Sequence, residues 1–146
     1  FEGTRGRWLN DRAEMRRRIV STMRTWQTFS DSNPADGIEM AIKNYWAPDK
    51  RISLYVLGDE FTGRSIQAAL DAVAKANRTD EEGRRRVRIH AIGFPEGGMA
   101  PFTNIRFAAL MRAMCEQNNG TFVGITTEKT CRAKINILGR ETCVET

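Results

Sequence analysis

The chain has 146 residues, of which 40% are hydrophobic and 28% are charged, and its formal net charge is +5. This length allows one domain with a real core and is too short for two domains of ordinary size. The composition excludes a disordered chain, and no apolar run approaches the roughly 20 residues of a membrane span. Because the first residue is Phe1 and not Met, we expect the sequence to be a fragment, a processed product or the ordered part of a longer protein, with any targeting or anchoring segment removed.

Two helices are predicted before the first strand. The first spans residues 10–28, with Asn10 or Asp11 as its cap, and it carries an apolar stripe at helical spacing. The stripe consists of Met15, Ile19, Met23 and Trp26. After a polar break at residues 29–34, a second helix is predicted over residues 36–45, and Pro48 ends it.

Three strands then alternate with two helices. The strands are predicted at residues 51–58, 87–94 and 121–125, and the helices at 66–77 and 103–117, capped by Ser65 and Thr103. The nearly continuous apolar run at 52–57 predicts a strand buried on both faces inside a parallel sheet. In the second of these helices the expected buried residues are Ile105, Phe107, Leu110, Met111 and Met114. One more strand is predicted in the tail, at residues 133–138.

This order predicts a single domain over residues 1–146, with its core at 36–125 and a C-terminal tail at 126–146. The predicted fold class is α/β, a three-layer αβα arrangement with a mainly parallel central sheet of Rossmann-like type.

A few chemically reactive or aromatic residues are expected to be structural. His90 lies in the middle of a predicted strand, where packing explains it better than catalysis, and Cys115 falls on the buried side of a helix. Trp8, Trp26 and Trp46 are expected to be core or interface anchors. With one histidine and no paired cysteines, a zinc site is not expected.

The remaining cysteines and the charge clusters leave alternatives open. Cys131 and Cys143 flank a short segment and form either a disulfide or two free thiols, so the compartment is not fixed. Arginine clusters at residues 16–18 and 84–86 are of the kind that binds phosphates. Because no aromatic residues interleave with them, we interpret them as solvated surface and do not expect nucleic acid binding.

One set of oxygen-bearing residues stands out as a candidate metal site. Asp59 and Glu60 follow the strand at 51–58, at the edge of the sheet where α/β proteins bind ligands, and Asp36 opens the preceding helix. Together with Thr62 they offer the carboxylate and hydroxyl oxygens that Mg²⁺ or Ca²⁺ prefers. The alternative is structural, with Asp36 as a helix cap and Asp59 accepting backbone N–H groups in a turn.

Three segments in order resemble the von Willebrand factor type A domain, and the resemblance runs from residue 36 to residue 125. Residues 36–42 are similar to the family's Gly-Gly-Thr-x-x-x-x-Ala-Leu helix start. Residues 52–60 are similar to its apolar strand ending in Thr-Asp-Gly, and residues 87–93 to its strand ending in Ala-Ile-Gly. A Gly-Thr-Phe-Val-Gly strand at 120–124 follows, as in many bacterial members.

The resemblance implies a metal-ion-dependent adhesion site that is degenerate here. The family's first loop, Asp-x-Ser-x-Ser, is absent, which indicates an N-terminally incomplete domain. Asp36 stands where the family has a metal-binding threonine, and Asp59 retains the aspartate of the third loop. The implied metal ligands are therefore Asp59, Asp36 and Thr62, and the implied cofactor is Mg²⁺, with Ca²⁺ or Mn²⁺ as alternatives.

These features predict a non-catalytic protein-interaction module with an unidentified protein partner and no small-molecule substrate. One alternative is an enzyme domain that binds a nucleotide or phosphate through Mg²⁺ at Asp59 and Glu60, although no phosphate-cradling glycine loop is present. Another is a basic nucleic-acid-binding module. Bacterial members of the family occur inside the cell and at the envelope. We favour the envelope, with membrane attachment only through a segment upstream of Phe1, and the oligomeric state stays open.

Overall fold

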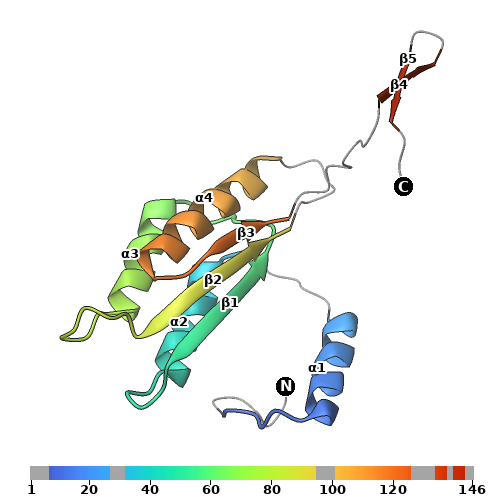
Figure 1. The fold of residues 1–146 in the computed structure, drawn as a ribbon. Coiled ribbons are helices and arrows are strands. Elements are labelled where there is room, and N and C mark those ends of the chain that lie inside the picture. Colours follow the sequence, from blue (N-terminus) through green and yellow to red (C-terminus); the bar gives the residue numbers. More distant parts are fainter. Residues whose placement is uncertain (1–6, 27–31, 95–100, 126–133, 138–139, 144–146) are drawn as a thin grey trace.

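The structure is a computed structural model that describes residues 7–26, 32–94, 101–125, 134–137 and 140–143. Figure 1 shows the arrangement of its helices and strands. In chain order they are α1 (Ala13–Thr25), α2 (Pro34–Tyr45), β1 (Ile52–Gly58), α3 (Ile66–Ala76), β2 (Val87–Gly93), α4 (Pro101–Gln117), β3 (Phe122–Gly124), β4 (Lys134–Ile137) and β5 (Arg140–Cys143). None of the described helices combines the length and apolar character that a membrane crossing requires.

Strands β1, β2 and β3 form a parallel sheet in that order. The register runs from Ile52 opposite Val87 to Gly58 opposite Gly93, and β3 pairs with the last three residues of β2. Right-handed crossovers between neighbouring parallel strands place α3 and α4 on the same face of the sheet. The predicted α/β class with a parallel sheet is confirmed, in a small and partial form.

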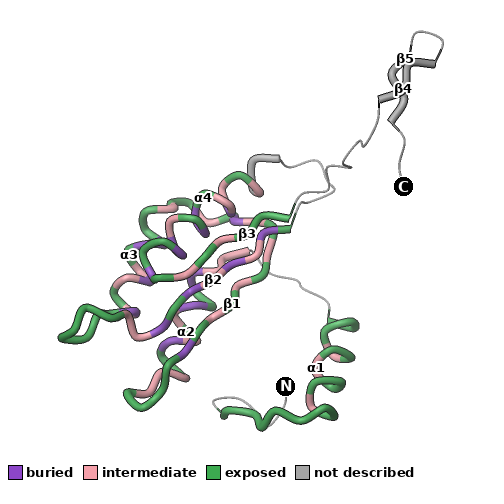
Figure 2. Tube along the Cα trace, viewed as in Figure 1, coloured by how far each residue is buried: buried purple, intermediate pink, exposed green. Residues whose placement is uncertain are grey.

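The hydrophobic core lies between this sheet and helices α2, α3 and α4, where the buried residues gather in Figure 2. In each helix the buried side chains recur every three or four residues, so each helix turns one stripe toward the sheet. The helix residues in the core are Ala35, Ile38, Ile42, Ala69, Leu70, Val73, Phe107, Leu110, Met111, Met114 and Cys115. The strands contribute Ile52, Val87, Ile89 and Ala91 from the facing side.

The other face of the sheet is uncovered within the described residues. Tyr55 is 66% exposed, Leu57 is 58% exposed and Val123 on β3 is 53% exposed. The prediction that residues 52–57 are buried on both faces is therefore wrong. Residues along β1 alternate between half-buried and exposed because helices cover one face only.

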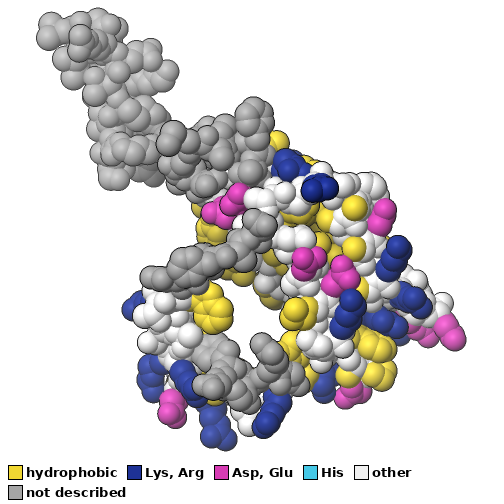
Figure 3. Space-filling view, turned by 180° about the vertical axis from the view of Figure 1, so that it is seen from behind, with side chains coloured by type: hydrophobic (Ala, Val, Ile, Leu, Met, Phe, Trp, Pro, Cys, Tyr) yellow, Lys and Arg dark blue, Asp and Glu magenta, His cyan; other side chains and the backbone are white. Residues whose placement is uncertain are grey.

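Helix α1 contributes no buried residue, and Trp26 at its end is 62% exposed. It is shorter than predicted and begins at Ala13, and no side chain caps its start. Asp11 does not act as the cap and forms an ion pair with Arg16. The N-terminal segment touches the domain through Trp8, whose ring meets that of Tyr45 edge-on at 5.8 Å. Figure 3 shows a gap between the segment that carries α1 and the rest of the domain.

One helix start agrees with its prediction and two differ from theirs. Ser65 caps α3 as predicted, since its hydroxyl accepts a hydrogen bond from the N–H of Ala68 at 3.1 Å. Helices α2 and α4 begin at prolines two residues earlier than predicted, as proline favours the first turn of a helix. Ile105 is 65% exposed and not buried. Ile105 and Phe107 are two residues apart, so their side chains are separated by about 200° around the helix axis. Ile105 therefore points away from the core that contains Phe107.

The tail forms a separate antiparallel hairpin of β4 and β5. Strand β4 falls within the predicted 133–138, and β5 was not predicted. The question of a disulfide between Cys131 and Cys143 lies outside the described residues.

Two buried asparagines complete the hydrogen bonding of β2 before the residues that pair with the short strand β3. The side chain of Asn77 accepts from the N–H of Val87 at 2.9 Å and donates to the same residue's carbonyl at 2.8 Å. It also donates to Oδ1 of Asn118 at 2.7 Å, and Asn118 donates to the carbonyl of Met114 at 2.7 Å. The carbonyl of Asn118 accepts from the N–H of Ile89 at 3.3 Å. The two asparagines thus bond backbone groups of β2 that a longer neighbouring strand would otherwise bond, because a buried backbone group needs a partner.

Candidate functional site

The loop after β1, residues 59–64, is held in place at the C-terminal edge of the sheet. Phe61 is 1% exposed and fills the core, and the guanidinium of Arg106 lies 5.1 Å from the centre of its ring. Arg106 also donates to the carbonyl of Gly63 and, at 3.3 Å, to that of Arg64. These contacts anchor the part of the loop that follows Asp59.

The same loop is joined to the start of α2. The backbone N–H of Thr62 donates to the carbonyl of Ser32 at 3.0 Å, and its hydroxyl donates to the same oxygen at 3.3 Å. Asn33, at the N-cap of α2, makes no side-chain capping bond, and its Oδ1 is buried without a hydrogen-bond partner in the described part of the chain. An acceptor in that state fits a position where a water or a cation completes the bonding.

The three predicted metal ligands lie at or near this edge, but they do not form a complete cluster. Asp59 is exposed directly after β1, and Thr62 is bound to Ser32. Asp36 is the third residue of α2 and lines a shallow hollow of about 290 Å³ on that helix, together with Glu39 and Lys43. No group of three or more His, Cys, Asp or Glu side chains that would hold a metal occurs among the described residues.

A divalent cation at this edge would therefore depend on oxygens of several kinds. Asp59 supplies a carboxylate, Thr62 a hydroxyl and Asn33 an amide oxygen, which are the ligand types that Mg²⁺ and Ca²⁺ accept. Asn33 did not enter the sequence-based prediction. Its position just before the helix is visible in the sequence, but its unsatisfied oxygen depends on tertiary packing.

His90 is a packed strand residue, as predicted. The ring of Tyr55 stacks on it with centroids 5.0 Å apart and planes 15° apart. Its Nδ1 accepts a hydrogen bond from the N–H of Thr121 at 3.2 Å, so the neutral ring carries its proton on Nε2. The lone pair that a catalytic base would use lies on Nδ1 in this tautomer, and it is committed here to the backbone N–H of Thr121.

Cys115 is a free cysteine and is 1% exposed. Burial raises the pKa of its thiol, and a hydrogen bond with the backbone of Ala91 opposes the shift in part. The thiol therefore stays protonated near neutral pH and is a poor nucleophile, in agreement with its predicted structural role.

Comparisons with protein-family models, with curated proteins and with solved structures find no match to this chain. The proposals on function therefore rest on the fold and the surface of this chain.

Proposed function

We propose that the domain is a non-catalytic protein-interaction module whose contact surface is the uncovered face of the sheet, formed by Tyr55, Leu57, Ile92 and Val123. The observation that carries this proposal is the exposure of Tyr55, Leu57 and Val123 at 66%, 58% and 53%. These side chains are not scattered. The register places Leu57 beside Ile92 and Ile92 beside Val123, in one row across all three strands.

Parallel sheets are covered on both faces in nearly all proteins, because the helices of their crossover connections pack on the faces. An apolar row left in water favours contact with a second apolar surface. Burying a large apolar side chain fully is worth about 1.5–3 kcal/mol. The three most exposed residues therefore offer several kcal/mol to a protein segment that completes the second layer.

A site-specific photo-crosslinker tests this assignment. The crosslinking residue is introduced at position 57 in the full-length protein in its native host, and at position 75 as the control. Lys75 is exposed in the last turn of α3, on the helical layer. A discrete protein adduct at position 57 and none at position 75 is the expected result. Equal adducts at both positions, or none at either, would remove the uncovered sheet face as the contact surface.

A second candidate function, binding of a partner's carboxylate through Mg²⁺, is favoured by the unsatisfied Oδ1 of Asn33 beside the loop of Asp59 and Thr62. It corresponds to the degenerate adhesion site that a relative of the von Willebrand factor type A domain would have, with Asp36 as a further ligand. In that arrangement Asp59, Thr62 and Asn33 would hold the cation, and the cation would supply the bond to the partner's carboxylate.

Thermal unfolding with and without a chelator separates this candidate from the first. Mg²⁺ or Mn²⁺ is expected to raise the melting temperature of the wild-type chain and to have no such effect on Asp59→Ala. Asp71→Ala, an exposed carboxylate on α3, serves as the matched control. If wild type and Asp59→Ala respond to the cation alike, the metal site is refuted while the uncovered sheet face is unaffected.

A further inference from the structure

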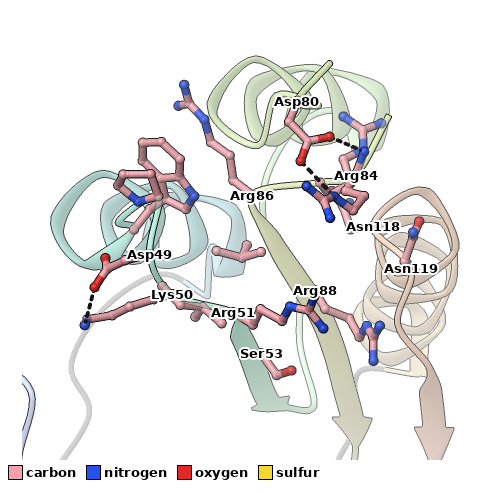
Figure 4. Close-up of a pocket in the computed structure, with 15 residues that line it drawn as sticks. Asp49, Lys50, Arg51, Ser53, Asp80, Arg84, Arg86, Arg88, Asn118 and Asn119 are labelled. Carbon is pink, nitrogen blue, oxygen red and sulfur yellow. Dashed lines mark hydrogen bonds and ion pairs between the residues drawn. The ribbon is translucent and has the colours of Figure 1, made fainter. Parts of the chain in front are cut away.

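At the opposite end of the sheet, the starts of β1 and β2 open into a cavity of about 780 Å³. Its wall comes from three separate segments of the chain, at residues 46–53, 80–88 and 118–119. Pockets for small molecules commonly measure about 300–1,000 Å³, so the volume suits a ligand of that kind. Figure 4 shows this cavity and its polar side chains.

The wall of the cavity is strongly cationic. Two of its residues are acidic, Asp49 and Asp80, and six are lysine or arginine. The six are Lys50, Arg51, Arg84, Arg85, Arg86 and Arg88. A concave surface with charges of one sign attracts and concentrates ligands of the opposite charge.

Most of these cations have a structural partner. Arg84 pairs with Asp80 at 2.9 Å, and that carboxylate also accepts from the backbone N–H of Arg84 at 2.7 Å. Arg85 donates to the carbonyl of Gln117 at 3.0 Å and to that of Asn77 at 2.9 Å. The arginine cluster at 84–86 is therefore not simple solvated surface, because much of its hydrogen bonding holds the turn before β2 in place.

Arg86 and Lys50 are also engaged. The guanidinium of Arg86 lies 4.4 Å from the centre of the Trp46 ring and donates to the carbonyl of Ala76 at 3.4 Å. Lys50 forms an ion pair with Asp49 at 3.3 Å. These contacts fix one side of the cavity and leave two of its six cationic side chains without a partner.

The side chains of Arg51 and Arg88 make no hydrogen bond or ion pair in the described part of the chain, and both residues are exposed. In Figure 4 both side chains lie near Ser53 and no dashed line joins them to a neighbour, whereas Arg84 is joined to Asp80. Ser53 lies opposite Arg88 in the sheet register, so the hydroxyl and the guanidinium share one face of the sheet. The cavity thus contains two guanidinium groups without a partner, beside a hydroxyl donor.

We propose that this cavity binds a phosphate group of a small anionic ligand, with Arg51 and Arg88 as its charged contacts and Ser53 as a hydroxyl donor. A phosphate monoester carries close to two negative charges at neutral pH, which matches the two unpaired guanidinium groups. The planar guanidinium also fits two phosphate oxygens at once. The six cations line one cavity of a volume that suits a small molecule, which favours a small ligand over a nucleic acid.

The test uses inorganic pyrophosphate as the probe. Its binding to the full chain is measured by NMR chemical-shift titration at low salt. We expect saturable shifts at the backbone amides of Ser53 and Arg88. In the double variant Arg51→Gln, Arg88→Gln the affinity should fall about tenfold or more, since each charge-assisted bond is worth roughly that factor. Neither side chain has a structural partner, so the variant should keep its fold, which the same spectra verify.

The matched control is Arg18→Gln with Arg64→Gln, which removes the same charge at exposed sites outside the cavity. Its affinity for pyrophosphate should stay within about twofold of wild type, and Arg51→Lys with Arg88→Lys should lose part of the affinity because the forked geometry is gone. An equal loss in both glutamine variants, or no shifts at millimolar pyrophosphate, would overturn the site. A single-stranded oligonucleotide that binds through the same arginines more than tenfold tighter than pyrophosphate would overturn the assignment to a small ligand.

Discussion

The buried amide of Asn77 offers the sharpest test of how the sheet is held together. Replacement by leucine keeps a similar side-chain volume and removes three hydrogen bonds, of 2.7, 2.8 and 2.9 Å. The N–H and carbonyl of Val87 and the Oδ1 of Asn118 then lose their partners in a site where Asn77 is 0% exposed. Each orphaned group costs about 1–3 kcal/mol, so we expect the three together to cost roughly 3–9 kcal/mol.

Equilibrium urea unfolding followed by circular dichroism measures this loss. A typical domain has about 5–15 kcal/mol of unfolding free energy, so Asn77→Leu should shift the midpoint clearly or leave the domain partly unfolded. The control is Asn44→Leu, because Asn44 is exposed on α2 and has no buried partner to lose. A loss smaller than about 1 kcal/mol for Asn77→Leu would refute the role of this amide as a substitute strand neighbour.

Two further substitutions test local features. Gly120→Ala should destabilise the domain by about 2–4 kcal/mol in the same assay, because the new methyl group would lie 1.6 Å from the carbonyl oxygen of Ile89. Gly37→Ala is the control and should be neutral or stabilising, because a methyl group there would meet nothing within 4 Å. Equal effects at the two glycines would contradict the close contact. Asp80→Asn should lower stability at neutral pH, because bonds from the backbone N–H and side chain of Arg84 hold the pKa of Asp80 below its usual value. Such a carboxylate stabilises the fold above its unfolded-state pKa, and this contribution is lost as the pH falls through the folded-state pKa, so the difference from wild type should vanish in acid. A difference that persists at the lowest pH would show that charge is not the cause.

The elements that the sequence predicted well are those with local signals. Ser65 is a hydroxyl residue followed by an alanine-rich apolar stripe, and it caps α3 as expected. The stop after α4 is equally local, since Asn119 takes a left-handed backbone at φ 57° and the N–H of Gly120 bonds to the carbonyl of Cys115 at 2.8 Å. Such signals act within a few residues and do not depend on the rest of the fold.

What the sequence could not show depends on residues far apart in the chain. The apolar run of β1 looks the same whether one or two layers cover it, so the exposure of Leu57 was not foreseen. Asn77 and Asn118 meet across 41 positions, and Arg106 reaches the carbonyl of Gly63 across 43. The cavity at Arg51 and Arg88 has the same origin, because only the strand register brings these two arginines to one end of the sheet.

The interaction role depends on the claim that one face of the sheet is open in the isolated chain. The most direct test is the unfolding free energy of Leu57→Ala, measured beside Leu110→Ala. Leu57 is 58% exposed and Leu110 is 0% exposed. We therefore predict a change within about 0.5 kcal/mol for Leu57→Ala and a loss of about 2–5 kcal/mol for Leu110→Ala. A loss at position 57 as large as the loss at position 110 would show that the chain covers this face itself, and would contradict the account.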